Sequence, residues 1–433
     1  MTYIYVDNFR GFTDTVIPLK PVNFLIGENS TGKTSILALL NLLSSHDFWF
    51  SQDFNSESHE FGGFKDILSV SASDQSEFTI GLCRTFRHTK TKKKKKVCYL
   101  ASYHEVEGLP NISYFSKLDG KTIVSMKSYR GSYKYFISKL EEEVADETDI
   151  SRIFHLTSET KSFDIKKYKS FPEKFPSKAG LIPTLSMLNS LAEQKKFERY
   201  EMLMPIPLFT YRMAWLAPIR TRPKRTYNGY GRNFSPEGEH TPYVLRKQLS
   251  LKQKVEVFRS ALERFGAESG LYKEVIINKL GKEATSPFEV LIVLTEKALR
   301  INSVGYGVSQ VLPLLVEMLV RPKETWFAIQ QPEVHLHPKA QAALGDLIFQ
   351  MSLQESKYFL IETHTDFTVD RFRLNYRKHE KVQPQAQILF FERIKDTNKV
   401  SVIPILQNGE YPTEQPAAFR DFFLKEQMKL LGV

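Results

Sequence analysis

The stretch Gly27-Glu28-Asn29-Ser30-Thr31-Gly32-Lys33-Thr34 has the G-x-x-x-x-G-K-[ST] pattern of a phosphate-binding loop. The apolar residues 22–26 before it predict a strand, and the apolar positions between 36 and 43 after it have helical spacing. This order places backbone amides at the N-terminus of a helix, where they can hold phosphate oxygens. The sequence therefore predicts an α/β fold with a site for a nucleoside triphosphate.

The residues of this loop have distinct expected roles. Gly27 and Gly32 allow the backbone to bend closely around an anion. Lys33 brings a positive charge to the β- and γ-phosphates, and the hydroxyl of Thr34 can ligate Mg²⁺. We therefore expect ATP and Mg²⁺ as cofactors. The expected nucleotide contacts in the loop are Gly27, Glu28, Asn29, Ser30, Thr31, Gly32, Lys33, Thr34 and Ser35.

The length and composition are those of a globular protein with two or three domains, since the chain has 433 residues of which 42% are hydrophobic and 25% charged. No apolar run has the length of a membrane span, and residues 1–6 lack the basic region of a signal peptide. We expect a cytoplasmic protein with no membrane partner. The two cysteines, Cys83 and Cys98, argue against a disulfide scaffold and against a cysteine-based metal site.

The net charge of +11 would suit a nucleic acid or an acidic protein as partner. Basic residues gather in two places, from Lys90 to Lys96 and from Arg220 to Arg225. The first patch lies between the strand-like residues 78–86 and 97–103, so a hairpin with a basic tip is expected. Each patch has two readings, a solvated loop or a binding site for acidic groups.

The order of the segments predicts an ATP-binding head interrupted by an insertion. We expect residues 1–130 to form the N-terminal half of the head, with the phosphate loop and β-hairpins, and residues 266–433 to form its C-terminal half. Residues 131–265 are charged and predict a mainly helical insertion. Strands are expected at residues 3–9, 15–19, 272–278, 288–294, 324–329, 358–362 and 388–392, and helices at 139–144, 187–204 and 252–265.

A glycine-rich motif in the C-terminal half precedes an apolar helix predicted at residues 311–320. Residues 304–310 read Val-Gly-Tyr-Gly-Val-Ser-Gln, which places Ser309 at the helix start. A serine there is either an N-cap or a hydroxyl presented, with the helix N-terminus, to an anion.

Two predicted strands in the same half end in polar residues. The strand at 324–329 is followed by Gln330 and Gln331, with Glu333 next to Pro332, and the strand at 358–362 is followed by His364. Polar side chains at the carboxyl ends of such strands lie beside the phosphate loop and face Mg²⁺ and the attacking water.

Taken in this order, the motifs resemble the ABC-type ATPase heads of the SMC, RecF and OLD group. The nearest resemblance is to the ATPase subunits of the PARIS and Septu anti-phage systems, whose helical insert carries a "GP-R…PKR" segment. Here that segment runs from Ala217-Pro218-Ile219-Arg220 to Pro223-Lys224-Arg225. The opening Asn8-Phe9-Arg10-Gly11-Phe12 and the ending Phe419-Arg420-Asp421-Phe422-Phe423 also match.

The resemblance implies an α/β fold with a P-loop ABC-type ATPase head, in which a mixed sheet is flanked by helices and a helical domain is inserted. It also implies that two heads pair through ATP, with Ser309 of one copy contacting the γ-phosphate held by Lys33 of the other. Charge-assisted contacts to a phosphate would make ATP a strong bridging ligand.

The sequence departs from this group at the end of the strand at 324–329, where the group has Asp/Glu-Glu-Pro and this chain has Gln330-Gln331-Pro332. A carboxylate at the first position ligates Mg²⁺ or its water, and at the second it is a general base. Loss of a general base typically costs about 10²–10⁴-fold in rate. We therefore expect slow hydrolysis. The catalytic candidates are Gln331, Glu333 and His364, and the metal candidates are Thr34 and Gln330.

Three functions follow from the resemblance. The first is a regulatory ATPase of an anti-phage system, which assembles as a homodimer or higher oligomer. It would control a separate nuclease or toxin and bind an acidic phage protein or DNA at the basic patches. The second is a DNA-repair clamp similar to RecF, and the third, which the long insert disfavours, is a transporter subunit. The sequence has no acidic cluster of the TOPRIM kind and no HNH pattern, and the roughly 65 residues after His364 are too few for a catalytic domain, so we expect the effector in trans.

Overall fold

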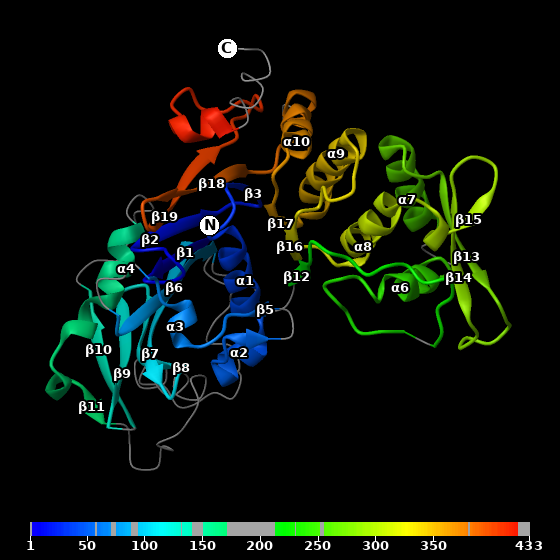
Figure 1. Ribbon diagram of the computed structural model, residues 1–433. Coiled ribbons are helices and arrows are strands. Elements are labelled where there is room, and N and C mark those ends of the chain that lie inside the picture. The colour runs from blue at the N-terminus through cyan, green and yellow to red at the C-terminus, as the bar shows by residue number, and fades with distance from the viewer. Residues whose placement is uncertain are drawn as a thin grey trace. The chain divides into compact units, whose positions relative to one another are not determined.

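The computed structural model describes residues 2–56, 59–70, 75–87, 94–130, 132–140, 150–170, 213–229, 231–251, 255–379 and 382–422 (Figure 1). The chain divides into two compact units, each made of several chain segments. The first contains Met1–Lys20, Glu28–Tyr211 and Phe391–Val402, and the second contains Pro21–Gly27, Arg212–Phe390 and Ile403–Val433. Among the described residues, no helix is both long enough and apolar enough to cross a membrane.

The first unit is built on an eight-stranded sheet in the order β11-β10-β9-β8-β7-β6-β1-β2, whose neighbouring strands are antiparallel. Cross-strand contacts between Tyr and aliphatic side chains form its core, and Ile153 and Phe154 of a covering helix pack into that core. The strands are β1 (Thr2–Asp7), β2 (Thr15–Leu19), β6 (Glu77–Arg87), β7 (Lys94–Val106), β8 (Leu109–Asp119), β9 (Thr122–Tyr129), β10 (Ser132–Lys139) and β11 (Lys169–Ser170).

The remaining elements of the first unit are short. Its α-helices are α1 (Lys33–Ser44), α2 (His46–Ser51), α3 (Phe64–Ile67) and the covering helix α4 (Ile150–Ser158). Strands β4 (Asn55–Ser56) and β5 (His59–Glu60) pair with each other, and the 3-10 turns η1 (Glu159–Ser162) and η2 (Ile165–Lys167) follow α4. Helix α1 buries most of its apolar residues, as its spacing predicts.

The second unit is built on a six-stranded sheet in the order β12-β16-β17-β3-β18-β19. The pairs β12–β16, β16–β17 and β17–β3 are parallel. All six residues of β3 are buried, as expected for a strand covered on both faces. The strands are β3 (Val22–Gly27), β12 (Met213–Leu216), β16 (Trp326–Gln330), β17 (Tyr358–Glu362), β18 (Ala386–Ile394) and β19 (Thr397–Pro404), and the last two extend into the segment assigned to the first unit.

Helices and a second, smaller sheet complete the second unit. The helices are α6 (Thr241–Gln248), α7 (Val255–Ser269), α8 (Tyr306–Val320), α9 (Pro338–Glu355) and α10 (Asp366–Lys378), with a 3-10 turn η4 (Ile301–Ser303). The small antiparallel sheet contains β13 (Glu274–Lys279), β14 (Phe288–Val293) and β15 (Ala298–Arg300). Helices α9 and α10 lie side by side (Figure 1) and approach closely at Gly345, where an added Cβ would lie 2.4 Å from the carbonyl oxygen of Thr368.

The structure confirms most expected elements but differs in the range 131–265. Helix α7 confirms the helix expected at 252–265, whereas residues 132–139 form β10 and residues 213–216 form β12. These strands form because each pairs with a neighbour, β9 and β16 respectively. The helix expected at 139–144 is wrong at Lys139, the last residue of β10; residues 141–144 and the helix expected at 187–204 lie outside the described residues. The predicted domain bounds stay a prediction.

The predicted hairpin of residues 78–86 and 97–103 is confirmed by the antiparallel pair β6–β7. Its basic tip is shorter than expected, because residues 94–96 belong to β7 and Lys96 is only 8% exposed. The residues from 88 to 93 lie outside the described part of the chain. Lys96 therefore cannot act as an exposed binding residue of this patch.

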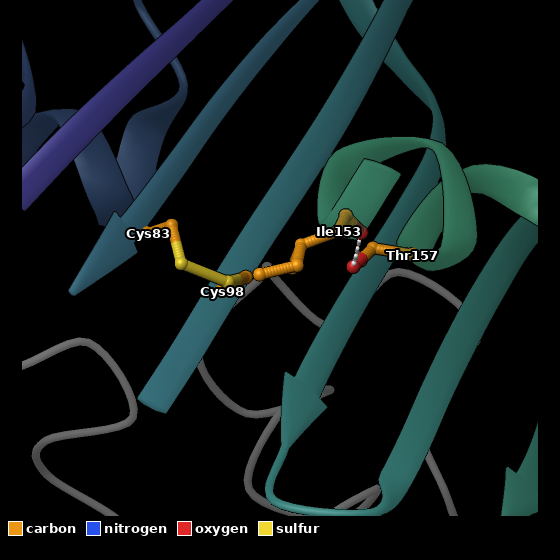
Figure 2. The surroundings of a disulfide bond; sticks show 4 residues. All are labelled: Cys83, Cys98, Ile153 and Thr157. Atoms are coloured by element: carbon orange, nitrogen blue, oxygen red, sulfur yellow. Dashed lines mark hydrogen bonds between the residues drawn. A yellow bond between two sulfur atoms is a disulfide. The ribbon is translucent and has the colours of Figure 1, made fainter. Parts of the chain in front are cut away.

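A disulfide joins Cys83 of β6 to Cys98 of β7 (Figure 2). The two residues are direct partners in the β6–β7 register, and both are fully buried next to Ile153 and Thr157 of α4. The sequence argued against a disulfide scaffold; the structure forms one cross-strand bond, because the register of the hairpin brings the two cysteines opposite each other.

A buried ion-pair cluster attaches helix α8 to the loop before α6. Glu317 accepts hydrogen bonds from Nε2 of His240 at 2.8 Å and from Nε of Arg321 at 2.5 Å, and the amide of Ser235 donates to Nδ1 of His240 at 3.1 Å. Glu317 and His240 are each 3% exposed. Since Nδ1 of His240 accepts a hydrogen bond, the ring proton is on Nε2, which donates the hydrogen bond to Glu317.

Replacing Glu317 by alanine should lower the free energy of unfolding by about 3–5 kcal/mol, because it leaves buried partners without their acceptor. Chemical denaturation measures this loss. The matched control is Glu256→Ala, which removes the exposed partner of Arg259 on α7 and should cost less than about 1 kcal/mol. Equal losses in the two variants would contradict a structural role for the cluster.

Candidate functional site

The phosphate-binding loop leaves β3 at Gly27 and runs directly into α1. Three of its residues have positive φ: Gly27 at +147°, Ser30 at +61° and Gly32 at +90°. The loop closes on itself, since Nζ of Lys33 donates to the carbonyl oxygen of Glu28 at 2.6 Å and the hydroxyl of Thr31 donates to the same oxygen at 2.8 Å. These two contacts stabilise the bend of the loop.

The N-terminus of α1 is suited to an anion. The helix has no acidic residue in its first turn, so its positive end is not neutralised. Lys33 is buried, Thr34 and Ser35 are half-buried, and Glu28, Asn29 and Ser30 are exposed. The predicted loop residues thus form the connection from the end of β3 to the first turn of α1. Their contacts with a nucleotide stay a prediction.

The opening motif of the chain supports this loop. An added Cβ at Gly32 would lie 2.5 Å from two ring atoms of Phe12 and 3.1 Å from Nδ2 of Asn398. The side-chain amide of Asn398 donates to the carbonyl oxygen of Arg10 at 3.0 Å, and its backbone amide donates to the carbonyl oxygen of Gly11 at 2.7 Å. The glycine-containing motif at residues 8–12 therefore shapes the surface on which the end of the loop rests.

In the second unit, the carboxyl ends of four neighbouring parallel strands lie along one edge of the sheet. These strands are β12, β16, β17 and β3, the strand from which the phosphate loop departs. The amide of Gln331 donates to the carbonyl oxygen of Glu362 at 2.8 Å, and the amide of Thr363 donates to Leu25 at 3.2 Å. In open α/β sheets this edge is where ligands bind.

Four of the predicted catalytic and metal-binding residues meet at this edge: Gln330, Gln331, Glu333 and His364. The backbone amide of His364 donates to Oε1 of Glu333 at 2.8 Å. The side-chain amide of Gln330 donates to Oε2 of Glu362 at 3.4 Å. Gln331 has a φ of +41°, a backbone conformation that residues other than glycine rarely adopt and that is concentrated at functional sites.

Glu333 has the properties of a general base. Burial raises the pKa of its carboxyl group above the usual value, although hydrogen bonds from the His364 and Glu333 backbone amides and the charge of Arg220 oppose this. Its Oε2 is buried and has no hydrogen-bond partner. A raised pKa makes a carboxylate a stronger base, so the role of Glu333 as general base stays a prediction that this environment favours.

The position of Ser309 differs from the prediction. Helix α8 begins at Tyr306 rather than at 311, with Gly305 as its N-cap, so Ser309 lies inside the first turns and is 6% exposed. Its hydroxyl donates to the carbonyl oxygen of Tyr306 at 2.8 Å. Ser309 lines a pocket together with Arg222 and Lys224. A separate cavity of about 850 Å³ has Gly305, Tyr306, Gly307 and Val308 of this helix end among its lining residues, with His335 and His337.

The predicted basic patch from Arg220 to Arg225 divides into a buried arginine and exposed basic residues, and its role as a binding site stays a prediction. Arg220 is 3% exposed, because Nη2 of its guanidinium donates to the carbonyl oxygen of Gln330 at 3.4 Å. Arg222 and Arg225 are exposed. The patch is therefore smaller than the sequence suggests, and its first member belongs to the edge of the sheet.

Sequence reasoning missed Arg220 and Glu362 as members of the site. Glu362 ends β17 in the same way that Gln330 ends β16, so the rule that placed Gln330 at this edge would also have placed Glu362 there. Arg220 gave no such signal, because the strand before it, β12, was not predicted.

Oxygen ligands for Mg²⁺ are present, but the described residues contain no cluster of three or more His, Cys, Asp and Glu side chains that could hold a metal alone. Gln330 and Glu362 offer an amide and a carboxylate at one edge. This set fits Mg²⁺, which takes one or two protein oxygens and completes its shell with water and phosphate.

Two family models match the chain. The one described as "AAA ATPase domain" matches residues 1–202, and the one described as "AAA domain, putative AbiEii toxin, Type IV TA system" matches residues 223–370. The chain is a P-loop ATPase. The α/β fold class and the P-loop ATPase head expected from the sequence are thereby confirmed, with ATP as the nucleotide of such domains.

One similar solved structure is that of "the recombination mediator protein RecF-ATPrS in RecFOR pathway". It is 12% identical over 92% of this chain and 97% of that chain, with a TM-score of 0.31. A likeness of this size carries no argument about function. No curated protein matches this chain.

Proposed function

We propose that this ATPase is a cytoplasmic regulatory subunit of a bacterial anti-phage system, with a head of the ABC type. It binds ATP with Mg²⁺, hydrolyses it slowly, and pairs with further copies of itself through the bound nucleotide. The assembled form holds a separate nuclease or toxin until an invader is sensed.

The observation that carries this proposal is the neutral end of β16. Gln330 and Gln331 stand where a hydrolysing head has carboxylates, and the amide of Gln330 is engaged by Glu362. With Glu333 in place of Gln331 as the general base, hydrolysis is slow, and ATP serves mainly to stabilise an assembly. The description of the second family model, which names a toxin of a toxin–antitoxin system, agrees with a defence role.

The main alternative is an ATP-dependent DNA clamp. The net charge of +11 favours it. The burial of Lys96 and Arg220 argues against it, because it removes two cations from the predicted basic patches. A clamp should bind DNA with an affinity that rises with ATP and falls steeply with salt.

The test is the mass of the purified protein without nucleotide, with ATP and Mg²⁺, and as Lys33→Ala with ATP, measured beside its turnover. We expect at least a doubling of mass with ATP, slow turnover, and no assembly of Lys33→Ala. A monomer that hydrolyses ATP rapidly would overturn the proposal, and salt-sensitive DNA binding that needs ATP would favour the clamp.

A further inference from the structure

Arg220 is a buried cation at the carboxyl edge of the main sheet in the second unit. It follows β12 by four residues, and its backbone amide donates to Oε1 of Gln310 at 3.4 Å. Its guanidinium reaches the last residue of β16, where Nη2 donates to the carbonyl oxygen of Gln330. Both contacts are long. Only the second one uses a donor of the guanidinium.

Two donors of this guanidinium have no acceptor. Arg220 is only 3% exposed, and its Nε and Nη1 are both buried without a hydrogen-bond acceptor. A buried donor without an acceptor costs the full desolvation of that group, and such groups in a folded protein call for an explanation. Burial lowers the pKa of Arg220 to about 10, so the group still carries its charge at neutral pH.

The charges around Arg220 leave room for an anion. Glu333 is the neighbouring acid whose charge acts on the guanidinium, and its Oε1 accepts a hydrogen bond from the backbone amide of His364. Gln330, the last residue of β16, and Gln331 after it are neutral, whereas the ATPase heads that this chain resembles carry carboxylates at these two positions. A pair of carboxylates there would compete for the arginine, whereas two amides add no negative charge, so that Glu333 is the acid whose charge acts on it.

We propose that Arg220 is a further phosphate-binding residue of this ATPase, whose free donors bind oxygens of a phosphoryl group at the edge of the sheet. Arginine is suited to this role because its planar, permanently charged group presents several donors in fixed directions. The phosphoryl group is either the terminal phosphate of ATP or the inorganic phosphate released from it. The inference rests on the ATPase activity and does not depend on the anti-phage role.

The experiment compares Arg220→Ala and Arg220→Gln with the wild type and with Arg222→Ala, an exposed arginine two residues along the same loop. For each protein, the Kd values for ATP, ADP and inorganic phosphate are measured, together with kcat. A contact with the terminal phosphate weakens ATP binding by about 10- to 100-fold in Arg220→Ala and leaves ADP binding unchanged. The value of kcat should fall by about 10²–10³-fold if the contact strengthens in the transition state.

The same measurements distinguish the terminal phosphate of ATP from released inorganic phosphate as the group that Arg220 binds. If Arg220 binds the released product, the Kd for inorganic phosphate rises in Arg220→Ala while the Kd for ATP stays as in the wild type. Added guanidinium at millimolar concentration should restore part of the lost binding in Arg220→Ala. Arg222→Ala should match the wild type throughout.

Equal changes in ATP and ADP binding, with no change for phosphate and no rescue, would show a purely structural role and overturn the proposal. If Arg220→Ala does not fold, Arg220→Gln decides, because it keeps a long polar side chain but removes the charge that binds phosphate. Wild-type affinities for ATP, ADP and phosphate in that variant would equally overturn the proposal. A wild-type protein that fails to bind ATP would instead contradict the ATPase itself, so the two failures are distinguishable.

Discussion

Replacing Glu333 by glutamine should lower kcat for ATP hydrolysis by about 10²–10⁴-fold and leave the Kd for ATP almost unchanged. Gln330 and Gln331 cannot accept a proton, so the base must come from elsewhere at this edge. Glu333 has one oxygen fixed by the amide of His364 and the other unpartnered. Glutamine keeps the shape and the acceptor for that amide but cannot take the proton from water.

The pH dependence of kcat gives a second measurement of the same role. A general base works when it is deprotonated, so turnover is present above its pKa and is lost as the pH falls through it. Because burial raises the pKa of Glu333 above 4.5, this loss should begin at a higher pH than for an exposed glutamate. The acid limb should disappear in Glu333→Gln.

Glu324→Gln is the matched control, since it makes the same chemical change at an exposed position before β16. It should behave as the wild type. The converse variant, Gln331→Glu, restores a carboxylate after the strand and should raise kcat if the missing acid is what slows hydrolysis. Unchanged turnover in Glu333→Gln would remove this residue from the mechanism, and a loss in His364→Ala would then assign the base to histidine.

The sequence predicted the elements around the phosphate loop because local patterns determine them. Strand β3 is a continuous apolar run that ends in glycine, and β16 and β17 are apolar runs that end in polar residues. A parallel strand buried on both faces has this pattern wherever it occurs. The meeting of Gln330, Glu333 and His364 then follows from the shared edge of the sheet.

The start of α8 was predicted five residues too late, because two glycines read as a loop. In the structure, Gly307 lies within the helix, and an added Cβ there would be 3.0 Å from the carbonyl oxygen of His335. The glycine serves this close approach and does not end the helix. Only the three-dimensional position of the turn that contains His335 distinguishes the two uses.

Other differences come from contacts between distant residues. All but the last residue of β10 are half-buried, so the strand lacks the alternation that signals a strand, and it forms by pairing with β9. Arg220 is buried by Gln310 and Gln330, which are 90 and 110 residues away. From the sequence alone, basic residues between prolines predict a surface loop. Only the three-dimensional positions of Gln310 and Gln330 show that Arg220 is buried.

Replacing Gly32 by alanine should destabilise the first unit by about 2–5 kcal/mol and abolish ATP binding. The residue has a φ of +90°, which costs an alanine about 1–2 kcal/mol, and the new methyl group would lie 2.5 Å from the ring of Phe12, which adds about 1–3 kcal/mol. The ring is fully buried and cannot move away freely. Relief therefore has to come from the loop, which would shift the backbone amides and Lys33 away from the phosphates.

Chemical denaturation and ATP titration of the folded protein measure the two effects. Gly231→Ala is the matched control, because no atom lies within 4 Å of its added Cβ. If Gly32→Ala unfolded at the same denaturant concentration as Gly231→Ala and bound ATP equally well, the loop would not depend on its close packing against the opening motif.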